Sequence, residues 1–72
     1  MPIIDMTATG KNIKDIMKAK GMKIKDIQKI LGFNTPQAIF KWFRGDAMPT
    51  IDNMVILAKI FDTTIDKLII TN

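Results

Sequence analysis

Thr35-Pro36-Gln37-Ala38-Ile39-Phe40-Lys41-Trp42-Phe43-Arg44-Gly45 is the segment that most clearly predicts a helix with two unlike faces. Threonine is a favoured N-cap, proline suits the first helical position, and glycine is typical of a helix C-terminus. We therefore expect a helix over about residues 36–44. At about 100° per residue, one side of this helix gathers the apolar residues Ile39, Trp42 and Phe43. The opposite side carries the polar residues Gln37, Lys41 and Arg44.

The polar side of this helix has the chemistry that recognises DNA. Glutamine bonds adenine with two hydrogen bonds, lysine reaches guanine or phosphate, and arginine reaches either. An ordinary amphipathic helix that shows polar residues to water has the same pattern. The segment by itself leaves both interpretations open, and the flanking sequence has to decide between them.

The composition excludes several classes of protein. The 72 residues include neither Cys nor His, which excludes disulfides, zinc sites and Ser-His or Cys-His catalysis. The Asp residues are scattered and mostly fall at helix starts or turns, so we expect no enzyme, no metal and no cofactor. There is no ligand-sensing domain, so no small-molecule ligand is expected. The absence of a signal peptide and of a long apolar run predicts a cytoplasmic protein without membrane contact.

Positive charge is concentrated in one half of the chain. Residues 10–45 carry nine Lys and Arg side chains against two Asp, whereas residues 46–72 carry two Lys against four Asp. This segregation favours one surface for a polyanion and another for a different contact. Lysines that merely keep an isoleucine-rich chain soluble are the alternative.

Hydrophobic periodicity predicts four more helices, over about residues 8–20, 24–31, 51–61 and 65–70. Thr7 or Thr9 would cap the first, and Gly21 and Gly32 would end the first two. Before the first helix, residues 1–7 form an apolar arm. It could be disordered, an extended edge, or a clip onto the domain or a second subunit. We therefore divide the chain into this arm and one domain over residues 8–72.

The apolar faces of these helices predict the core. Ile13, Ile16 and Met17 would face inward from the first helix, and Phe33 would fill the space between the second and third. The second helix would bury the stripe Ile24, Ile27, Ile30 and Leu31. The fourth would bury Met54, Leu57, Ala58 and Phe61.

With these elements placed, the chain resembles the helix-turn-helix domains of the Cro and lambda-repressor type, the xenobiotic-response-element-type (XRE-type) regulators. The resemblance covers about residues 9–70 and rests on an ordered set of short motifs, none of them specific alone. The matching motifs are Lys18-Ala19-Lys20-Gly21, Ile27-Gln28-Lys29-Ile30-Leu31-Gly32, Trp42-Phe43-Arg44-Gly45, Pro49-Thr50-Ile51-Asp52-Asn53 and Leu57-Ala58. It implies an all-α, compact five-helix bundle with its helix-turn-helix at the second and third helices.

The resemblance also implies a function, that of a repressor-like regulator that binds double-stranded DNA sequence-specifically. The third helix would lie in the major groove, usually in a homodimer on a two-fold-related operator. The expected base contacts are Gln37, Lys41, Ala38 and Pro36, with Ala38 small enough to approach a thymine methyl. The expected phosphate contacts are Lys23, Lys25, Thr35 and Arg44. Phe40 should be partly exposed, against DNA or a neighbouring segment.

The sequence departs from the family pattern in three places. The segment from Gly32 to Gly45 is one residue longer than the commonest spacing, which would shift the third helix in the groove. Lys23 and Ile24 replace the Ser or Thr and the Gln that often open the second helix. Met17 and Phe43 replace a buried Arg-Glu pair, and two packed apolar residues can take the place of such a pair at little cost. We therefore predict that Met17 and Phe43 are in contact.

Two questions stay open at the level of sequence. One is whether Ile56, Ile60, Ile69 and Ile70 form a dimer interface or a tight C-terminal core within one chain. A single module covers only a half-site, which favours the dimer. The other is whether the domain is instead a protein-interaction module, such as an antitoxin or antirepressor built on the same fold.

Overall fold

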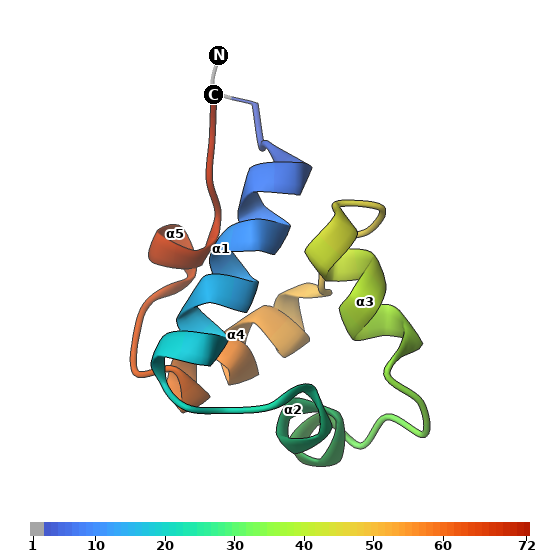
Figure 1. The fold of residues 1–72 in the computed structure, drawn as a ribbon. Coiled ribbons are helices and arrows are strands. Elements are labelled where there is room, and N and C mark those ends of the chain that lie inside the picture. Colours follow the sequence, from blue (N-terminus) through green and yellow to red (C-terminus); the bar gives the residue numbers. More distant parts are fainter. Residues whose placement is uncertain (1–2) are drawn as a thin grey trace.

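Five helices follow one another in the computed structural model, which describes residues 3–72 (Figure 1). Their bounds are α1 Met6–Ala19, α2 Ile24–Leu31, α3 Gln37–Arg44, α4 Ile51–Ile60 and α5 Ile65–Leu68. The expected all-α bundle is confirmed, and α2 has the bounds that the sequence predicts. None of the helices within residues 3–72 has the length and apolar character needed to cross a membrane.

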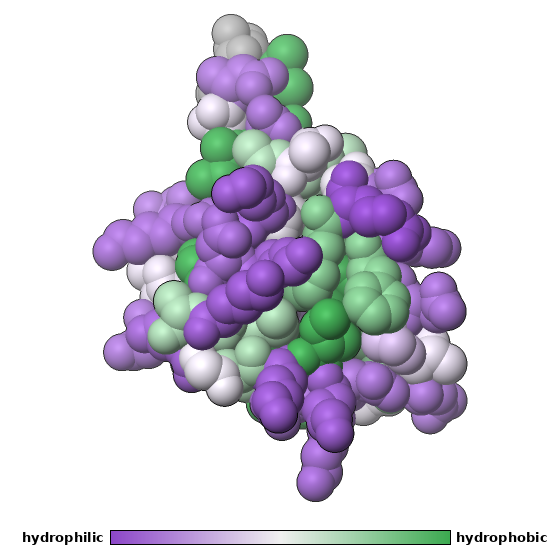
Figure 2. Space-filling model, viewed as in Figure 1, coloured by the Kyte–Doolittle hydropathy of each residue, from purple (hydrophilic) through white to green (hydrophobic). Residues whose placement is uncertain are grey.

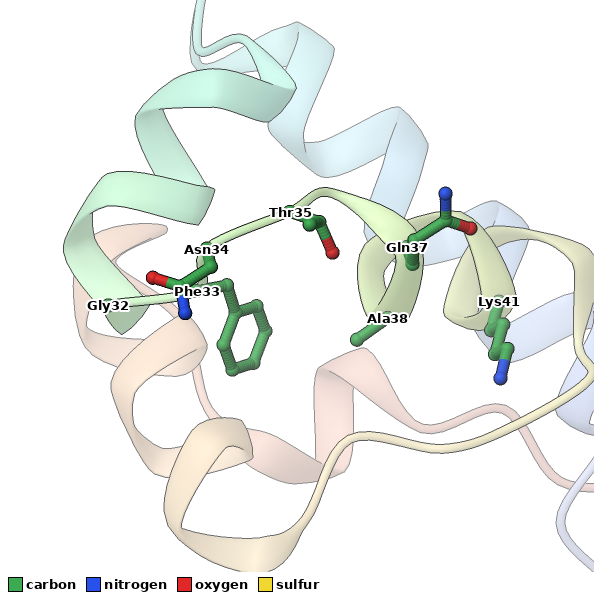
Figure 3. A pocket seen from close by; sticks show the side chains of 7 residues that line it. All are labelled: Gly32, Phe33, Asn34, Thr35, Gln37, Ala38 and Lys41. Atoms are coloured by element: carbon green, nitrogen blue, oxygen red, sulfur yellow. The ribbon is translucent and has the colours of Figure 1, made fainter.

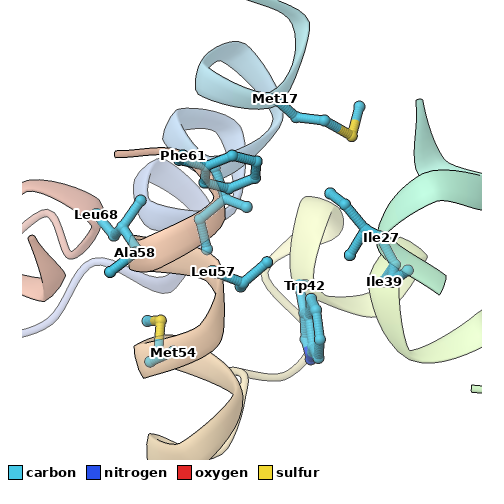
Figure 4. Packing of buried hydrophobic residues seen from close by; sticks show 10 residues of the cluster. Met17, Ile27, Ile39, Trp42, Met54, Leu57, Ala58, Phe61 and Leu68 are labelled. Carbon is cyan, nitrogen blue, oxygen red and sulfur yellow. The ribbon is translucent and has the colours of Figure 1, made fainter. Parts of the chain in front are cut away.

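The core lies where α1, α3 and α4 meet, and α2 and α5 close it from the sides (Figures 1 and 4). Its buried apolar residues are Ile13, Met17, Ile27, Ile39, Trp42, Met54, Leu57, Ala58, Phe61 and Leu68. The inward face predicted for α4 is confirmed in all four positions. The stripe predicted for α2 is wrong at Ile30, which is 48% exposed. Ile30 is exposed because it lies at the edge of the apolar face of α2, whereas Ile27 lies at the centre of that face and is buried.

Two helix starts differ from the prediction. α1 begins at Met6 because Asp5 is the N-cap, and its carboxylate accepts a hydrogen bond of 2.9 Å from the backbone N–H of Ala8. Neither Thr7 nor Thr9 is therefore the cap, and Met6 and Thr7 lie in the helix. α3 begins at Gln37, with Pro36 rather than Thr35 at its N-cap position. The first intrahelical bond of α3 is accepted by the Pro36 carbonyl oxygen, which is one residue past Thr35.

Three helix ends also differ from the prediction, whereas two N-cap positions are confirmed. α1 ends at Ala19, α4 at Ile60 and α5 at Leu68, short of the expected residues 20, 61 and 70. Thr50 and Thr64 hold the N-cap positions of these helices, but neither side chain makes the capping hydrogen bond. Gly21, Gly32 and Gly45 all have positive φ at the C-terminal ends of the first three helices, as predicted.

A close approach between α1 and α3 fixes the position of α3. Gly10 is buried in α1, and a Cβ atom there would overlap the carbonyl oxygen of Trp42. It would also lie 3.0 Å from the carbonyl oxygen of Phe43. At the end of α3, a Cβ on Gly45 would lie 2.7 Å from the Cα of Thr7. The two helices therefore touch through their backbones, which leaves no room for side chains between them.

Polar side chains of α1 hold the C-terminal segment. The buried Thr9 hydroxyl accepts a hydrogen bond of 2.9 Å from the Ile70 N–H and donates one of 3.3 Å to the Ile70 carbonyl. The Asn12 amide donates to the carbonyl oxygens of Lys67 and Leu68 at 2.8 and 3.0 Å. These bonds satisfy backbone groups that the short helix α5 leaves unpaired.

Residues 3–5 lie beside the C-terminal residues 70–72 (Figure 1). Ile4 forms an isolated antiparallel bridge with Thr71. The Asp5 N–H donates to the Ile70 carbonyl at 2.8 Å, and the Asn72 N–H donates to the Ile3 carbonyl at 2.9 Å. Of the alternatives open for the arm, the structure shows an extended segment that is clipped onto its own domain over residues 3–5.

Candidate nucleic-acid interface

α3 presents its polar residues to the outside because its apolar residues are anchored in the core. Ile39 and Trp42 are buried, and the Phe33 ring meets the Trp42 ring edge-on at a centroid distance of 5.8 Å. Gln37 and Lys41 are exposed on the other side of the helix. No hydrogen bond or ion pair within residues 3–72 engages either side chain. Both polar groups are thus available to an external partner, as predicted.

Phe40 and Ala38 flank these two polar residues. Phe40 is 38% exposed, which confirms that it is at least partly accessible beside Lys41. Ala38 is half-buried and packs against the edge of the core. The exposed surface of α3 therefore combines an amide, an ammonium group and part of an aromatic ring. This is the kind of mixed surface that makes both hydrogen bonds and apolar contacts with base edges.

A hollow lies beside α3 at the turn from α2 (Figure 3). Its lining residues are Gly32, Phe33, Asn34, Thr35, Gln37, Ala38 and Lys41. In Figure 3, the Phe33 ring, the Thr35 side chain and the Ala38 methyl are directed into the hollow, whereas the Gln37 amide and the Lys41 chain point away from it. Four residues expected to contact DNA therefore line one hollow, namely Thr35, Gln37, Ala38 and Lys41. The sequence analysis did not predict this hollow.

The start of α2 carries the two lysines expected to contact phosphate. Lys23 is its N-cap residue, and Lys23 and Lys25 are both exposed. The Asp26 carboxylate accepts a hydrogen bond of 2.8 Å from the backbone N–H of Lys23. A lysine side chain has no acceptor, so only this half of a capping box can form. Asp26 thus compensates for the poor cap directly, and both ammonium groups stay at the positive end of the helix.

Arg44, the fourth expected phosphate contact, is already paired. Its Nε donates to the Asp46 carboxylate at 2.9 Å, and both side chains are 58% exposed. An ion pair this exposed contributes only about 0–1 kcal/mol. It therefore leaves the remaining guanidinium N–H groups accessible and does not block a contact with phosphate. Thr35, the expected phosphate contact before the opposite end of α3, is exposed.

The lysines of α1 have different surroundings. Lys11 forms an exposed ion pair with Asp15 at 3.1 Å. Lys14 places its Nζ 5.9 Å from the centroid of the Phe43 ring, across the contact between α1 and α3. Figure 2 shows hydrophilic side chains over α1 and along the outer edge of α3, with an apolar patch between the helices. Lys11 and Lys14 are therefore engaged within the domain, unlike the two lysines of α2.

The predicted packing of Met17 and Phe43 is compatible with the structure. Met17 is buried, and Phe43 is half-buried against the same core cluster. Neither side chain lies mostly in water, which would have contradicted the prediction. A direct contact between the two stays a prediction.

The residues expected at a dimer interface divide into two groups. Ile56 is 36% exposed on α4, whereas Ile60, Ile69 and Ile70 are half-buried. Ile60 and Ile69 pack against the core of their own chain. The sequence analysis missed Ile51 and Val55, which are 80% and 40% exposed one turn apart on α4. The low polarity of α4 on all sides was the available signal.

The geometry agrees with what comparison with known proteins finds. A family model described as helix-turn-helix matches residues 13–68, which is more than half of the chain. The chain belongs to the XRE-type helix-turn-helix family. α2 and α3 are accordingly the helix-turn-helix of this XRE-type domain, and family membership supports a DNA-binding transcription regulator.

A solved structure shares the fold of this XRE-type domain. The restriction-modification controller protein C.AhdI from Aeromonas hydrophila matches with a TM-score of 0.76 at 20% sequence identity. The match covers 89% of this chain and 96% of that protein. No curated protein matches the sequence significantly. Because the two sequences are only 20% identical, the likeness to C.AhdI concerns the fold alone, which is the lambda-repressor-like arrangement of helices.

Proposed function

We propose that this protein is a sequence-specific, repressor-like regulator that inserts α3 into the major groove of double-stranded DNA. The observation that carries the proposal is the exposure of Gln37 and Lys41 on a helix whose opposite side is anchored by Ile39 and Trp42. An anchored helix holds its polar groups in a fixed register, which is what selection of base edges requires. The fold shared with a controller protein supports the same class of function.

Residues at the start and in the first two turns of α3 would contact the base edges. Gln37 offers an amide donor and acceptor that match adenine, and Lys41 offers a donor that matches guanine. Pro36 and Ala38 are half-buried beside Gln37 and add apolar contact. Gln37 and Lys41 lie about one turn apart on α3, so the two side chains would contact different base pairs.

Phosphate contacts would frame this helix from both ends. Lys23 and Lys25 lie at the start of α2, Thr35 precedes α3, and Arg44 ends it. All four side chains are exposed. Such contacts set the orientation of the domain on the duplex and supply most of the affinity that does not depend on sequence.

The test of the proposal is a selection from random duplexes with the purified protein. We expect one enriched motif, with half-sites related by two-fold symmetry and separated by about one helical turn. Enrichment of no motif, with equal binding to every duplex, would contradict sequence-specific recognition. The selected duplex is the operator used in the experiments below.

Lys41→Ala should weaken binding to the operator by about 1–3 kcal/mol if its ammonium group contacts a base. The loss should be largest for the selected operator and small for duplexes altered at the contacted base pair. Lys59→Ala, which removes an exposed lysine from α4, is the matched control. Equal losses for all duplexes would show that Lys41 contacts phosphate instead.

A homodimer is the second part of the proposal. Ile56 is exposed on α4, as are Ile51 and Val55, and Ile60, Ile69 and Ile70 are half-buried in the C-terminal part of the chain. Apolar residues on the outer surface of a helix favour a protein contact. The same observation favours the alternative of an antitoxin or antirepressor, for which the partner would be a different protein.

Ile56→Asp should convert a dimer to a monomer, because it places a charge among apolar side chains at the interface. Analytical ultracentrifugation of both proteins measures the change. Ile30→Asp, at a similarly exposed apolar position on α2, is the control and should leave the dimer intact. A wild-type monomer, or an unchanged Ile56→Asp dimer, would rule out this interface.

A further inference from the structure

A second hollow, which we call the α5 hollow, lies between α5 and the paired segments 3–5 and 70–72. Its lining residues are Ile4, Ile65, Asp66, Ile69 and Thr71. Three isoleucines make most of its surface apolar, and the exposed Asp66 adds a carboxylate. In Figure 1, α5 and α3 lie on opposite sides of α1. The α5 hollow is therefore separate from the surface proposed to contact DNA.

The C-terminal segment leaves a backbone edge open at this hollow. The Ile70 N–H donates to the Thr9 hydroxyl, and the Ile70 carbonyl accepts from the Asp5 N–H. Successive residues of an extended segment turn their N–H and C=O groups to opposite sides, so those of Thr71 point away from these partners. No hydrogen bond within residues 3–72 engages either group of Thr71. Such an edge is a template on which another extended chain can pair.

The side chains around the open edge share one face. Ile4 lies directly opposite Thr71 in the antiparallel bridge, and Ile69 precedes Thr71 by two residues. All three side chains therefore project to the same side, where they line the α5 hollow with Ile65 of α5. A chain that pairs with Thr71 would place every second side chain on this apolar face.

The open edge is held in place before any partner arrives. The Thr9 hydroxyl accepts from the Ile70 N–H at 2.9 Å, and the Asn72 N–H donates to the Ile3 carbonyl at 2.9 Å. The Asn12 amide fixes the end of α5 through two carbonyl oxygens, at 2.8 and 3.0 Å. A binding site that needs no rearrangement loses little of its affinity to ordering.

We propose that the α5 hollow binds an extended segment of a partner protein by strand addition at Thr71, and that this segment carries an apolar residue flanked by basic ones. The free N–H and C=O of Thr71 call for an extended backbone, and the three isoleucines call for an apolar side chain. Charge complementarity calls for the basic residues. Asp66 lines the hollow, and residues 46–72 carry four Asp against two Lys. This inference goes beyond the proposed function and does not depend on it.

The peptide acetyl-Lys-Thr-Ile-Thr-Lys-amide is the probe, because it presents this pattern in either chain direction. Its isoleucine would pair with Thr71, and the two lysines on the same face would reach Asp66. Titration into isotope-labelled protein is followed by NMR. We expect shifts of the Thr71 and Asp66 amide signals, and hydrogen exchange at the Thr71 N–H slowed about tenfold or more at saturation.

A peptide with an N-methylated isoleucine is the control for strand addition. The methyl group removes the hydrogen-bond donor to the Thr71 carbonyl and leaves charge and side chains unchanged. Loss of one such bond should weaken binding about fivefold or more. Equal binding of the two peptides, or binding of neither, would overturn the proposal.

Asp66→Lys tests the charge. This variant should bind the lysine peptide about tenfold more weakly than the wild type and should prefer acetyl-Glu-Thr-Ile-Thr-Glu-amide. Asp52→Lys is the matched control, because Asp52 and Asp66 are both exposed second residues of a helix. It should keep the wild-type preference. If circular dichroism shows that Asp66→Lys is unfolded, Asp66→Asn replaces it and should weaken binding about fivefold.

The remaining outcomes concern the occupant of the hollow. An unchanged preference for the lysine peptide in the Asp66 variants would overturn the basic character of the partner. Analytical ultracentrifugation with the peptide tests for a second copy of this chain, since Ile69 also belongs to the proposed dimer interface. Conversion of a dimer to a monomer by the peptide would assign the hollow to that dimer and overturn the proposal. All these measurements are made without DNA, so their failure would leave the proposed regulator intact.

Discussion

Gly10→Ala is expected to lower the free energy of unfolding by about 3 kcal/mol or more. In an ordinary helix this change is stabilising by roughly 0.5–1 kcal/mol, because alanine has the better helix propensity. Here the added Cβ would overlap the Trp42 carbonyl oxygen and press on that of Phe43. Both atoms belong to the backbone of α3, so no side-chain rotation can relieve the overlap. The helices would have to move apart and open the core around Trp42.

Chemical denaturation of the wild type and of Gly10→Ala measures this effect. Lys18→Ala, on the exposed face of α1, is the control and should change stability by less than about 0.5 kcal/mol. Binding of the operator should fall together with stability, since the same contact positions α3. A Gly10→Ala protein as stable as the wild type would show that α1 and α3 do not approach as closely as described.

Raising the salt concentration from 50 to 200 mM is expected to weaken operator binding about 500-fold. About five phosphate contacts would give a slope of roughly −4 to −5 in log affinity against log salt, because each contact releases counterions from the duplex. Lys23 and Lys25 at the start of α2 and Arg44 at the end of α3 would supply three of these contacts. Titrations at four or five salt concentrations give the slope.

Single lysine variants measure how much each lysine contributes to this salt dependence. Lys23→Ala and Lys25→Ala should each reduce the magnitude of the slope by about 1. Lys11→Ala removes the same charge from α1, where the ammonium group is paired with Asp15 at 3.1 Å, and should leave the slope unchanged. A slope near zero for the wild type would contradict the phosphate contacts altogether.

Local rules were enough to predict most of the helices. Gly21, Gly32 and Gly45 follow the ends of the first three helices, as the sequence predicts. The prediction holds because a residue with positive φ interrupts a helix wherever it occurs. The start of α1 was missed because Asp5 was assigned to the arm, and the start of α3 because Thr35 seemed the better cap. Asp and Thr both suit an N-cap position, so cap preference alone did not distinguish Asp5 from Thr7 or Thr9. At α3 the Pro36 carbonyl accepts the first helical hydrogen bond, although Thr35 has the higher cap preference.

Long-range contacts could not be predicted in the same way. The exposure of Gln37 and Lys41 followed from helical periodicity, and the structure agrees. The hollow at Phe33 depends on how the turn packs against Trp42, and the role of Gly10 depends on the distance between α1 and α3. A glycine in the middle of a helix was a signal for such an approach, since it is otherwise unfavourable there.

The antiparallel bridge between Ile4 and Thr71 has a consequence for the covalent architecture of the protein. Since Ile3 lies beside Asn72, a short peptide linker between these two residues would close residues 3–72 into a ring without distorting the helices. A ring has fewer unfolded conformations than an open chain, so the cyclic protein should melt at a higher temperature in calorimetry and still bind DNA. A melting temperature no higher than that of the linear form would show that residues 3–5 and 70–72 do not lie together in solution.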